Sequence, residues 1–479
     1  MFNLRKIDES RVAKISNTRY REYYHIQTPG GWLNDPNGFC FFKGYYHVFY
    51  QYHPYSAEWG PMHWGHVRSK DLVHWENLPV ALVPGDPEDT GGCFSGSAIV
   101  KDNRLYLIYT GHHYYEDGDQ EHFWENQNVA YSDDGIHFTK YDHNPIIEAP
   151  TDNSQDFRDP KVWQHGDQYY LILGSRAQET NRARILLYQS DDLLHWQYKG
   201  PVAESTNNQL EGSMWECPDF FRLNGQDIIA CSPMGIQPQR HRFLNLNQST
   251  AFIGHFDYQQ AQFIHNDLHL LDYGHNFYAP QSFLTPDGRQ IQFGWFSSFD
   301  QAMPEQADGW AGALTLPREL ILHDDQVGTI PAQETELLRV GEVINTTKII
   351  NRSHQFTVPD PQHTEWDLTF DLPDYGGQVS WQLANSDHAL IAFNYDQGSG
   401  EVTVHQHNQE TDRYASIGHP TQLQVRIFVD TSSVEIFVNN GAATFTERYY
   451  TNDQTLINTI DTSKPITTTI KAYNLGMKG

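Results

Sequence analysis

The segment Gly44-Tyr-Tyr-His-Val-Phe-Tyr50 sets a polar turn before a run of aromatic and β-branched residues, a pattern typical of a hairpin that enters a β-strand. Four later segments repeat this form, and they begin at Asn103, Gly166, Gly225 and Gly288. Successive starts are 59, 63, 59 and 63 residues apart. Five such units, with several short strands each, predict a five-bladed β-propeller. The alternative is an irregular β-sandwich whose similar segments arise by chance.

The pattern changes after Leu320, which suggests a second domain. Residues 321–345 have few strand signals, and we interpret them as a linker. From about residue 346 the alternating runs return, and the turn Asn439-Asn-Gly-Ala442 joins two of them as a hairpin. We therefore predict an all-β chain, with a propeller over residues 1–320, a linker over 321–345 and an antiparallel β-sandwich over 346–479.

Composition and charge exclude several classes of protein. The chain has 479 residues and a net charge of −28, so it repels nucleic-acid phosphates and anionic membrane surfaces. It has no run of about 18 apolar residues that could span a membrane, and residues 1–10 do not resemble a secretory signal. We expect no nucleic-acid or membrane partner, a cytoplasmic location, and free cysteines rather than disulfides.

Carboxylates recur at one position of the repeat, shortly before the hairpin of the unit. The motifs at this position are Asn34-Asp-Pro-Asn-Gly38, Phe94-Ser-Gly-Ser97, Arg158-Asp-Pro160, Trp215-Glu-Cys-Pro-Asp219 and Tyr278-Ala-Pro-Gln281. The first strand of every propeller blade lines the central channel, so Asp35, Asp159 and Glu216 should face one another. Each Asp-Pro pair is also compatible with an ordinary turn. Because clustering like charges is costly, we favour a functional cluster.

Two carboxylates that flank a scissile bond are the apparatus of glycoside hydrolysis. One attacks or activates water, and the other gives a proton to the leaving oxygen. Side chains near the motifs suit a sugar ring, and the candidates for binding it are the aromatic Trp59, Phe94 and Trp310 and the polar Asn34, Gln51, Ser95 and Arg158. We also expect Arg158 to keep the neighbouring Asp159 ionised.

The same motifs resemble those of glycoside hydrolase family 32, the β-fructofuranosidases, as do two further segments, Trp59-Gly-Pro-Met-His-Trp-Gly-His66 and Asp430-Thr-Ser-Ser-Val-Glu-Ile-Phe-Val438. The resemblance extends over nearly the whole chain. It implies a five-bladed catalytic propeller with a β-sandwich, and retaining hydrolysis of terminal β-D-fructofuranosides without a metal or other cofactor. The 25 histidines form no convincing ligand set with a carboxylate, which agrees with that expectation.

The resemblance also implies roles for the three carboxylates. Asp35 would be the nucleophile that forms a fructosyl-enzyme intermediate, and Glu216 would be the general acid and then the base. Asp159 would hold fructose hydroxyls and stabilise the transition state. Retention of configuration implies that the carboxyl groups of Asp35 and Glu216 lie about 5–5.5 Å apart.

The implied substrate is a small sugar, sucrose or sucrose 6-phosphate, with fructans and fructo-oligosaccharides as alternatives. A phosphorylated substrate needs a local basic patch in this acidic chain. The candidate clusters for that patch are Arg176, Arg182 and Arg184, or Arg240, His241 and Arg242. Two other hypotheses remain: a non-catalytic carbohydrate-binding propeller, and an inverting glycosidase of another sugar with carboxyl groups about 6.5–9.5 Å apart.

Overall fold

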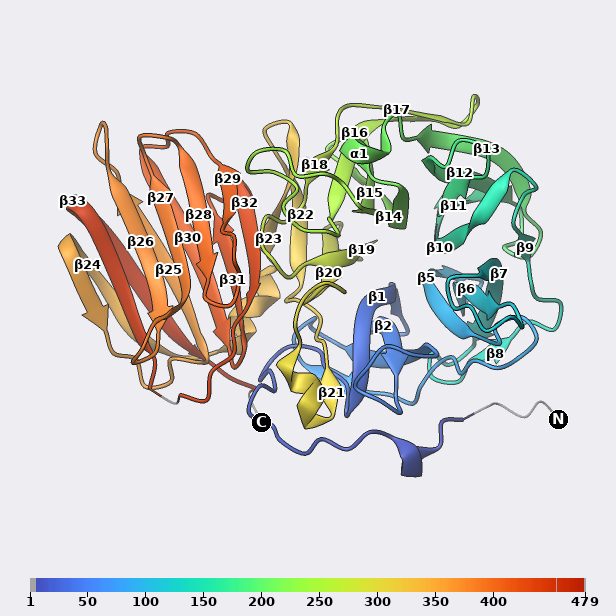
Figure 1. Cartoon of the computed structure of the whole chain (residues 1–479), viewed down its shortest axis with the longest axis horizontal. Coiled ribbons are helices and arrows are strands. Elements are labelled where there is room, and N and C mark those ends of the chain that lie inside the picture. Colours follow the sequence, from blue (N-terminus) through green and yellow to red (C-terminus); the bar gives the residue numbers. More distant parts are fainter. Residues whose placement is uncertain (1–5, 454, 478–479) are drawn as a thin grey trace.

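The computed structural model describes residues 6–453 and 455–477. Figure 1 shows two bodies, a ring of five sheets and a stack of long strands beside it. The predicted all-β class, with a five-bladed propeller followed by a C-terminal β-sandwich, is confirmed. Four short helices accompany the strands, namely η1 (Glu9–Arg11), α1 (Asn208–Glu211), η2 (Pro304–Asp308) and η3 (Gln333–Leu338).

Each blade is a sheet whose strands follow one another along the chain. The first three blades contain β1 (Gly31–Phe42), β2 (Tyr45–His53), β3 (His63–Ser69) and β4 (Trp75–Asn77); β5 (Gly92–Lys101), β6 (Arg104–Tyr114), β7 (Phe123–Ser132), β8 (Thr139–Lys140) and β9 (Ile147–Glu148); and β10 (Asn153–His165), β11 (Gln168–Ala177), β12 (Ala183–Ser190) and β13 (Gln197–Glu204).

The last two blades complete the ring. They contain β14 (Met214–Leu223), β15 (Gln226–Met234), β16 (Thr250–Asp257), β17 (Gln262–His265) and β18 (His269–Leu270); and β19 (Tyr278–Leu284), β20 (Gln290–Trp295), β22 (Arg318–His323) and β23 (Gln326–Pro331). The first strands contact one another in the order β1, β5, β10, β14, β19 and back to β1. The start of every blade therefore lies at the centre of the ring (Figure 1).

A short strand closes the ring. β21 (Trp310–Ala311) pairs in parallel with the start of β1, with Gly31 opposite Trp310 and Trp32 opposite Ala311. β21 follows β20, the second strand of the fifth blade, so a late segment of the propeller joins the sheet of the first blade. This pairing fixes the backbone immediately before Asn34 and Asp35.

The burial of a strand's side chains depends on how many of its faces are covered by other parts of the protein. Inner strands of the blades are covered on both faces, so β11 is apolar without alternation and its Leu171, Ile172 and Leu173 are fully buried, whereas outer strands such as β4 and β17 are largely exposed. In the sandwich, β26 and β28 have one covered face and alternate between buried and partly exposed residues, whereas β31 and β32 are buried on both faces. The two kinds of sequence pattern thus reflect two kinds of packing.

The sandwich is assembled around one long strand. Its strands are β24 (Arg339–Phe356), β25 (Thr364–Asp371), β26 (Gln378–Ala384), β27 (Ala389–Asp396), β28 (Glu401–Gln406), β29 (Arg413–Ser416), β30 (Gln422–Asp430), β31 (Ser433–Val438), β32 (Ala443–Arg448) and β33 (Ile457–Leu475). The first half of β33 pairs with β26, its second half pairs with β25, and β24 runs along both halves. β33 therefore belongs to both halves of the sandwich.

The structure corrects the predicted linker over residues 321–345. β22 continues past Leu320, and β23 completes the fifth blade as far as Pro331. η3 and the start of β24 occupy most of the remaining residues. The charged segment His323-Asp-Asp-Gln326 is the turn of a hairpin rather than the start of a linker, because β22 and β23 pair directly on either side of it.

Buried charges join the propeller to the sandwich. His25, which precedes the first blade, lies 2.7 Å from a carboxylate oxygen of Asp430 and 3.0 Å from one of Glu435. Burial alone would lower the pKa of His25, but the two carboxylates outweigh it and raise that pKa to about 10. The imidazolium therefore bridges two acids of the sandwich.

Two arginines extend this interface. Arg318 of the fifth blade pairs with Asp272 at 2.7 Å and also donates to Glu435. Arg448 of the sandwich lies 3.6 Å from Glu22 of the N-terminal segment. All of these side chains are almost fully buried. Because unpaired buried charges are costly, the interface holds the two domains in one arrangement.

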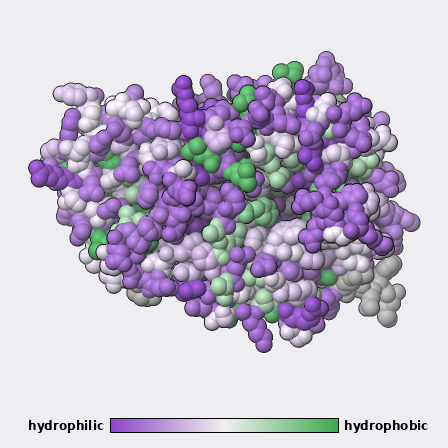
Figure 2. Space-filling view, viewed as in Figure 1, coloured by the Kyte–Doolittle hydropathy of each residue, from purple (hydrophilic) through white to green (hydrophobic). Residues whose placement is uncertain are grey.

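Hydrophilic residues cover most of the face seen in Figure 2, in keeping with the net charge of −28. Hydrophobic residues on this face gather in small groups near its middle. Across the described part of the chain, no helix has the length and hydropathy needed to cross a bilayer.

We predict that His25→Gln lowers the free energy of unfolding by about 3–5 kcal/mol at pH 7, because it leaves two buried carboxylates without their cation. The pKa of His25 is raised, so its contribution is complete below its unfolded value of about 6.5 and is lost as pH rises to about 10. The stability difference between wild type and variant should therefore shrink from pH 7 to pH 10, as measured by denaturant unfolding.

The matched control for this experiment is His137→Gln. His137 pairs with Asp134 on the surface, and its side chain is 66% exposed. We expect this change to leave stability nearly unaltered at every pH. A His25→Gln protein as stable as the wild type at pH 7 would contradict the role given to the buried bridge.

Candidate active site

The first strand of every blade is irregular at the same place. Its pairing with the second strand shifts between Leu33 and Pro36 in β1, Phe94 and Gly96 in β5, Arg158 and Lys161 in β10, Glu216 and Asp219 in β14, and Tyr278 and Gln281 in β19. Four of the five irregularities contain or border a proline, which cannot donate to a ladder. Such bulges redirect side chains. The sequence motifs lie in these bulges, inside the first strands rather than before them.

Asp35 is buried in the bulge of β1. Its Oδ2 accepts a hydrogen bond from the Ser95 hydroxyl at 2.9 Å and lies 3.5 Å from the Cys217 thiol. Its Oδ1 is also buried, and none of the described residues offers it a hydrogen bond. One oxygen is therefore held in place while the other is free to react.

Burial raises the pKa of Asp35 to about 6. The amide side chain of the adjacent Asn34 opposes the shift, the charge of Glu216 adds to it, and the Ser95 hydroxyl and Cys217 thiol again oppose it. The pKa of this carboxyl group is thus moved toward neutral pH, and shifts of this kind are common among the titratable groups of functional sites.

Asp159 meets the same cysteine from the third blade. Its Oδ2 accepts a hydrogen bond from the backbone N–H of Cys217 at 2.8 Å and lies 3.5 Å from the thiol. Burial raises the pKa of Asp159 to about 8, Arg158 opposes the shift, and Glu216 and Asp35 add to it. Carboxylates from the first and third blades therefore meet at a residue of the fourth.

Glu216 has a partner for each oxygen. Oε1 accepts hydrogen bonds from Arg158 Nε at 3.1 Å and Nη2 at 2.9 Å. Oε2 accepts one from the hydroxyl of Tyr278 at the start of the fifth blade. The structure therefore brings Asp35, Asp159 and Glu216 together at the centre of the ring, where residues of four blades hold them.

Arg158 has several carboxylate partners. Its guanidinium pairs with Glu216, with Asp156 at 2.7 Å and with Glu125 at 3.4 Å. Arg158 lowers the pKa of Asp159, which is the predicted direction, but burial and the neighbouring carboxylates outweigh it and raise that pKa overall. Arg158 also orients Glu216.

The polar candidates line the base of the site. Ser95 is bound to Asp35, as described above. Asn34 Oδ1 accepts a hydrogen bond from the Trp32 indole at 2.8 Å. Gln51 donates to the carbonyl oxygen of Cys93 at 3.1 Å and is almost fully buried. The contacts of Ser95 and Gln51 join the first two blades, whereas that of Asn34 stays within β1.

Two of the three aromatic candidates lie together. The Phe94 ring stacks on His112 with centroids 4.1 Å apart, and Trp59 meets its edge at 5.9 Å. Trp59 is 41% exposed, so its ring is open to a ligand. Trp310 is fully buried in β21 beneath Arg21, and the prediction that it contacts a sugar is wrong. Its strand closes the ring, which explains its burial.

Two residues in the sequence motifs, Tyr278 and Cys217, contact the central acids although the sequence did not mark them as candidates. Tyr278 occupies the position in the fifth blade that corresponds to the acids, and that equivalence could have indicated its contact with Glu216. Cys217 is part of the motif that begins at Trp215, and its thiol faces Asp35 and Asp159. Glu125 has no motif, and only the fold shows that it supports Arg158.

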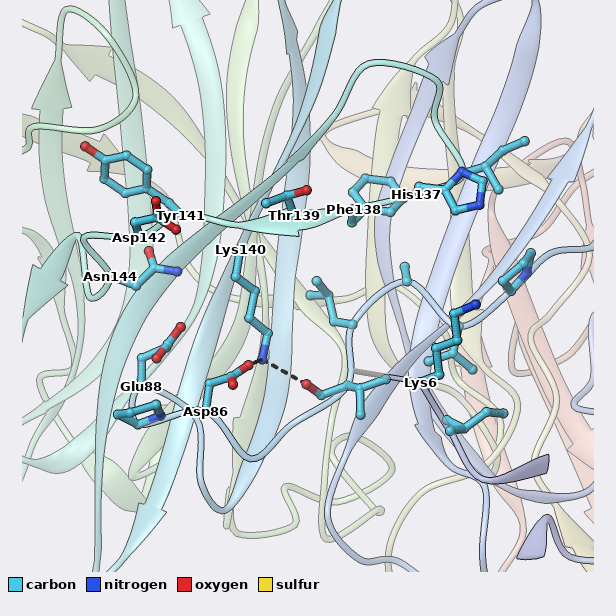
Figure 3. Close-up of a pocket in the computed structure, with 18 of the residues that line it drawn as sticks. Lys6, Asp86, Glu88, His137, Phe138, Thr139, Lys140, Tyr141, Asp142 and Asn144 are labelled. Carbon is cyan, nitrogen blue, oxygen red and sulfur yellow. Dashed lines mark hydrogen bonds and ion pairs between the residues drawn. The ribbon is translucent and has the colours of Figure 1, made fainter. Parts of the chain in front are cut away.

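Two groups of acids and histidines in the described chain have metal-like spacing, and both lie outside the carboxylate cluster. One is Glu22, His25 and Asp430 of the domain interface, and the other is Asp86, Glu88 and Asp89. Figure 3 shows Lys140 reaching Asp86 at the second group, beside a cavity of about 510 Å³. Lys140 also pairs with Asp89 at 2.6 Å, so a side-chain cation already lies among these acids.

Comparison with known proteins gives a consistent family assignment. Residues 25–331 match the model described as "Glycosyl hydrolases family 32 N-terminal domain", and residues 334–474 match "Glycosyl hydrolases family 32 C terminal". A curated relative from Escherichia coli, named sucrose-6-phosphate hydrolase, is 38% identical and covers 92% of each chain.

Two solved structures are similar over almost their whole length. One is a mutant of a Bombyx mori GH32 beta-fructofuranosidase in complex with sucrose, with a TM-score of 0.85, 35% identity, and coverage of 98% of this chain and 95% of the other. The second is a sucrose-6-phosphate hydrolase from Lactobacillus gasseri, with a TM-score of 0.85, 28% identity, and coverage of 96% and 94%.

We predict that Ser95→Ala raises the pKa of Asp35 above its value of about 6, because the Ser95 hydroxyl stabilises the ionised carboxylate. The measurement is an NMR titration of carboxyl carbons in protein labelled at aspartate. Ser97→Ala is the control, since the Ser97 hydroxyl donates to the carbonyl oxygen of Pro160 instead. An unchanged Asp35 titration in Ser95→Ala would contradict the electrostatic role given to this bond.

Proposed function

Because the chain belongs to family 32 of the glycosyl hydrolases, we propose that Asp35, Glu216 and Asp159 carry out its retaining hydrolysis of terminal β-D-fructofuranosides. The observation that carries this assignment is the unpartnered Oδ1 of Asp35 among the described residues. It lies in a cluster where Oδ2 of Asp35, Oδ2 of Asp159 and both oxygens of Glu216 accept hydrogen bonds from neighbouring blades. An unbonded, buried oxygen of this kind suits a nucleophile.

In the first step, Oδ1 of Asp35 attacks the anomeric carbon of the fructosyl unit. The bond to the glycosidic oxygen breaks, and Glu216 transfers a proton to that oxygen as the leaving sugar departs. In the second step, Glu216 removes a proton from water, and the water oxygen displaces Asp35 from the anomeric carbon. Two inversions at one carbon return the original configuration.

The surrounding residues prepare both steps. Ser95 holds Oδ2 of Asp35, so only one oxygen faces the substrate. Arg158 and Tyr278 fix the carboxyl plane of Glu216. The carboxyl group of Asp159, whose pKa is raised by burial and by the neighbouring acids, is placed to form a hydrogen bond with a fructose hydroxyl. Such preorganised groups lower the barrier without rearrangement.

The proposed substrates are sucrose and sucrose 6-phosphate, in keeping with the names of the relatives. One candidate cluster for binding a phosphate, formed by Arg176, Arg182 and Arg184, lies on the third blade. It is linked to Glu216, because Asp156 pairs both with Arg176 and with Arg158, which holds Glu216. Its members are already paired, Arg176 with Asp156, Arg182 with Glu204 and Arg184 with Asp152. These pairs neutralise much of the charge that a phosphate would meet.

We predict that Asp35→Ala lowers kcat on sucrose by about a thousandfold or more, because it removes the nucleophile of a group of residues that act together. Released glucose measures the rate, and thermal unfolding shows whether the variant is folded. Asp134→Ala is the control, since Asp134 caps a surface turn far along the second blade. A folded Asp35→Ala protein with nearly wild-type turnover would exclude the proposed mechanism.

We also predict that kcat/KM for sucrose 6-phosphate differs from that for sucrose by less than about tenfold, or roughly 1.4 kcal/mol of transition-state binding. The reason is that the arginines of the third blade are neutralised by acids. Both substrates are compared at low ionic strength, where charge effects are strongest. A larger preference for the phosphorylated sugar would show that its phosphate binds a basic group that no acid neutralises.

A further inference from the structure

A second cavity, of about 410 Å³, lies at the edge of the second blade. Its lining includes Tyr115, Trp124, Asn126, Glu148, Ser154 and Gln155. Trp124 is near the start of β7, which pairs with the end of β6. The end of β6 also pairs with the start of β5. Ser95 of the active site is also near the start of β5. The cavity therefore opens at the same end of the blade as the carboxylate cluster.

Two aromatic rings in this cavity are held flat against histidines. Trp124 stacks on His113, with centroids 3.8 Å apart and planes inclined by 5°. Tyr115 stacks on His122 at 4.0 Å. Yet Trp124 is 39% exposed and Tyr115 is 45% exposed, so each ring is supported on one side and open on another.

His113 forms a rigid base for the tryptophan. Its Nδ1 lies 3.0 Å from the Thr90 hydroxyl, and its Nε2 lies 3.0 Å from the carbonyl oxygen of Glu88. Burial lowers its pKa, so the ring is neutral and adds no charge. Because the Trp124 ring is already immobilised, a ligand that packs on it loses little additional side-chain entropy.

The lining indicates the chemistry of the ligand. Glu88 and Glu148 place acidic groups at the cavity, which disfavours a phosphate or another anion. Ser154 and Gln155 supply polar side chains beside the two aromatic rings. An uncharged molecule with hydroxyl groups and an apolar ring face satisfies all of these features. A sugar unit is such a molecule.

The cavity is joined to the active site through Glu125, the neighbour of Trp124 in β7. Glu125 accepts a hydrogen bond from the backbone N–H of Phe157 at 2.8 Å and pairs with Arg158, which holds Glu216. β7 lies two strands from β5, a distance of about 10 Å. A saccharide longer than a disaccharide can therefore extend from one site toward the other.

We propose that the Trp124 cavity is a second saccharide-binding site, which takes the uncharged distal units of an oligosaccharide whose terminal fructoside occupies the carboxylate cluster. This inference rests on the proposed function for its substrate, but the cavity binds sugar whether or not Asp35 is the nucleophile. It adds affinity for longer fructosides and contributes nothing to sucrose, which is too short to reach it.

The first test compares kcat/KM on sucrose, 1-kestose and inulin. Trp124→Ala should lower the value for inulin by about five- to tenfold, as expected for loss of one aromatic contact, and leave sucrose unchanged. Tyr198→Ala is the matched control, because Tyr198 is a similarly exposed ring (38%) on the third blade, outside the cavity. An equal decline on sucrose and inulin, or no decline on either, would overturn the proposal.

A second test measures binding without turnover. Inulin oligosaccharides are titrated by calorimetry into Asp35→Asn protein and into the double variant Asp35→Asn/Trp124→Ala. We expect weaker binding in the double variant, and equal affinities would refute the cavity site even if the catalytic assignment held. Tyr115→Ala, which changes a ring outside β7, replaces Trp124→Ala if the latter does not fold. Nearly wild-type turnover by the Asp35→Asn protein, with inulin binding that still depends on Trp124, would count against Asp35 as the nucleophile and leave the cavity site standing.

Discussion

The active site depends on holding three acids in a buried space where their charges repel. The closed ring of first strands enforces this proximity, since β1, β10 and β14 supply one acid each and contact one another through the ring. The repulsion is offset locally by donors from other blades, including the Ser95 hydroxyl, the Cys217 backbone and the Tyr278 hydroxyl. The packing of the ring thus stabilises an arrangement that the carboxylates alone would not adopt.

The sandwich supports this ring through charge as well as packing. His25 and Arg318 come from the propeller side and meet Glu435 of β31, so one acid of the sandwich is bound by two cations. Among the described residues, the ion-pair partners of His25 and Arg318 are Asp272, Asp430 and Glu435, which lie outside the central carboxylate cluster. The second domain therefore acts on the site through the rigidity of the fifth blade and of the segment before the first.

Periodicity in the sequence was sufficient to predict the blades, because a turn before an apolar run is a local signal that repeats five times. Equivalent repeat positions were sufficient to predict that Asp35, Asp159 and Glu216 meet. The sequence could not separate Trp59 from Trp310, because exposure depends on ring closure by a distant strand. It also could not predict the partners of Arg158, since Glu125 approaches from another blade and has no local motif.

The two-residue strand β21 has one more consequence. It joins the last part of the propeller to Gly31 and Trp32, a few residues before Asp35, so the ring is closed next to the proposed nucleophile. If that short junction parted during heating, the circle would open there first and Asp35 would move away from Glu216 and Asp159. Inactivation would then precede melting of the individual blades, and a polypeptide that still has its β-structure would already be inert.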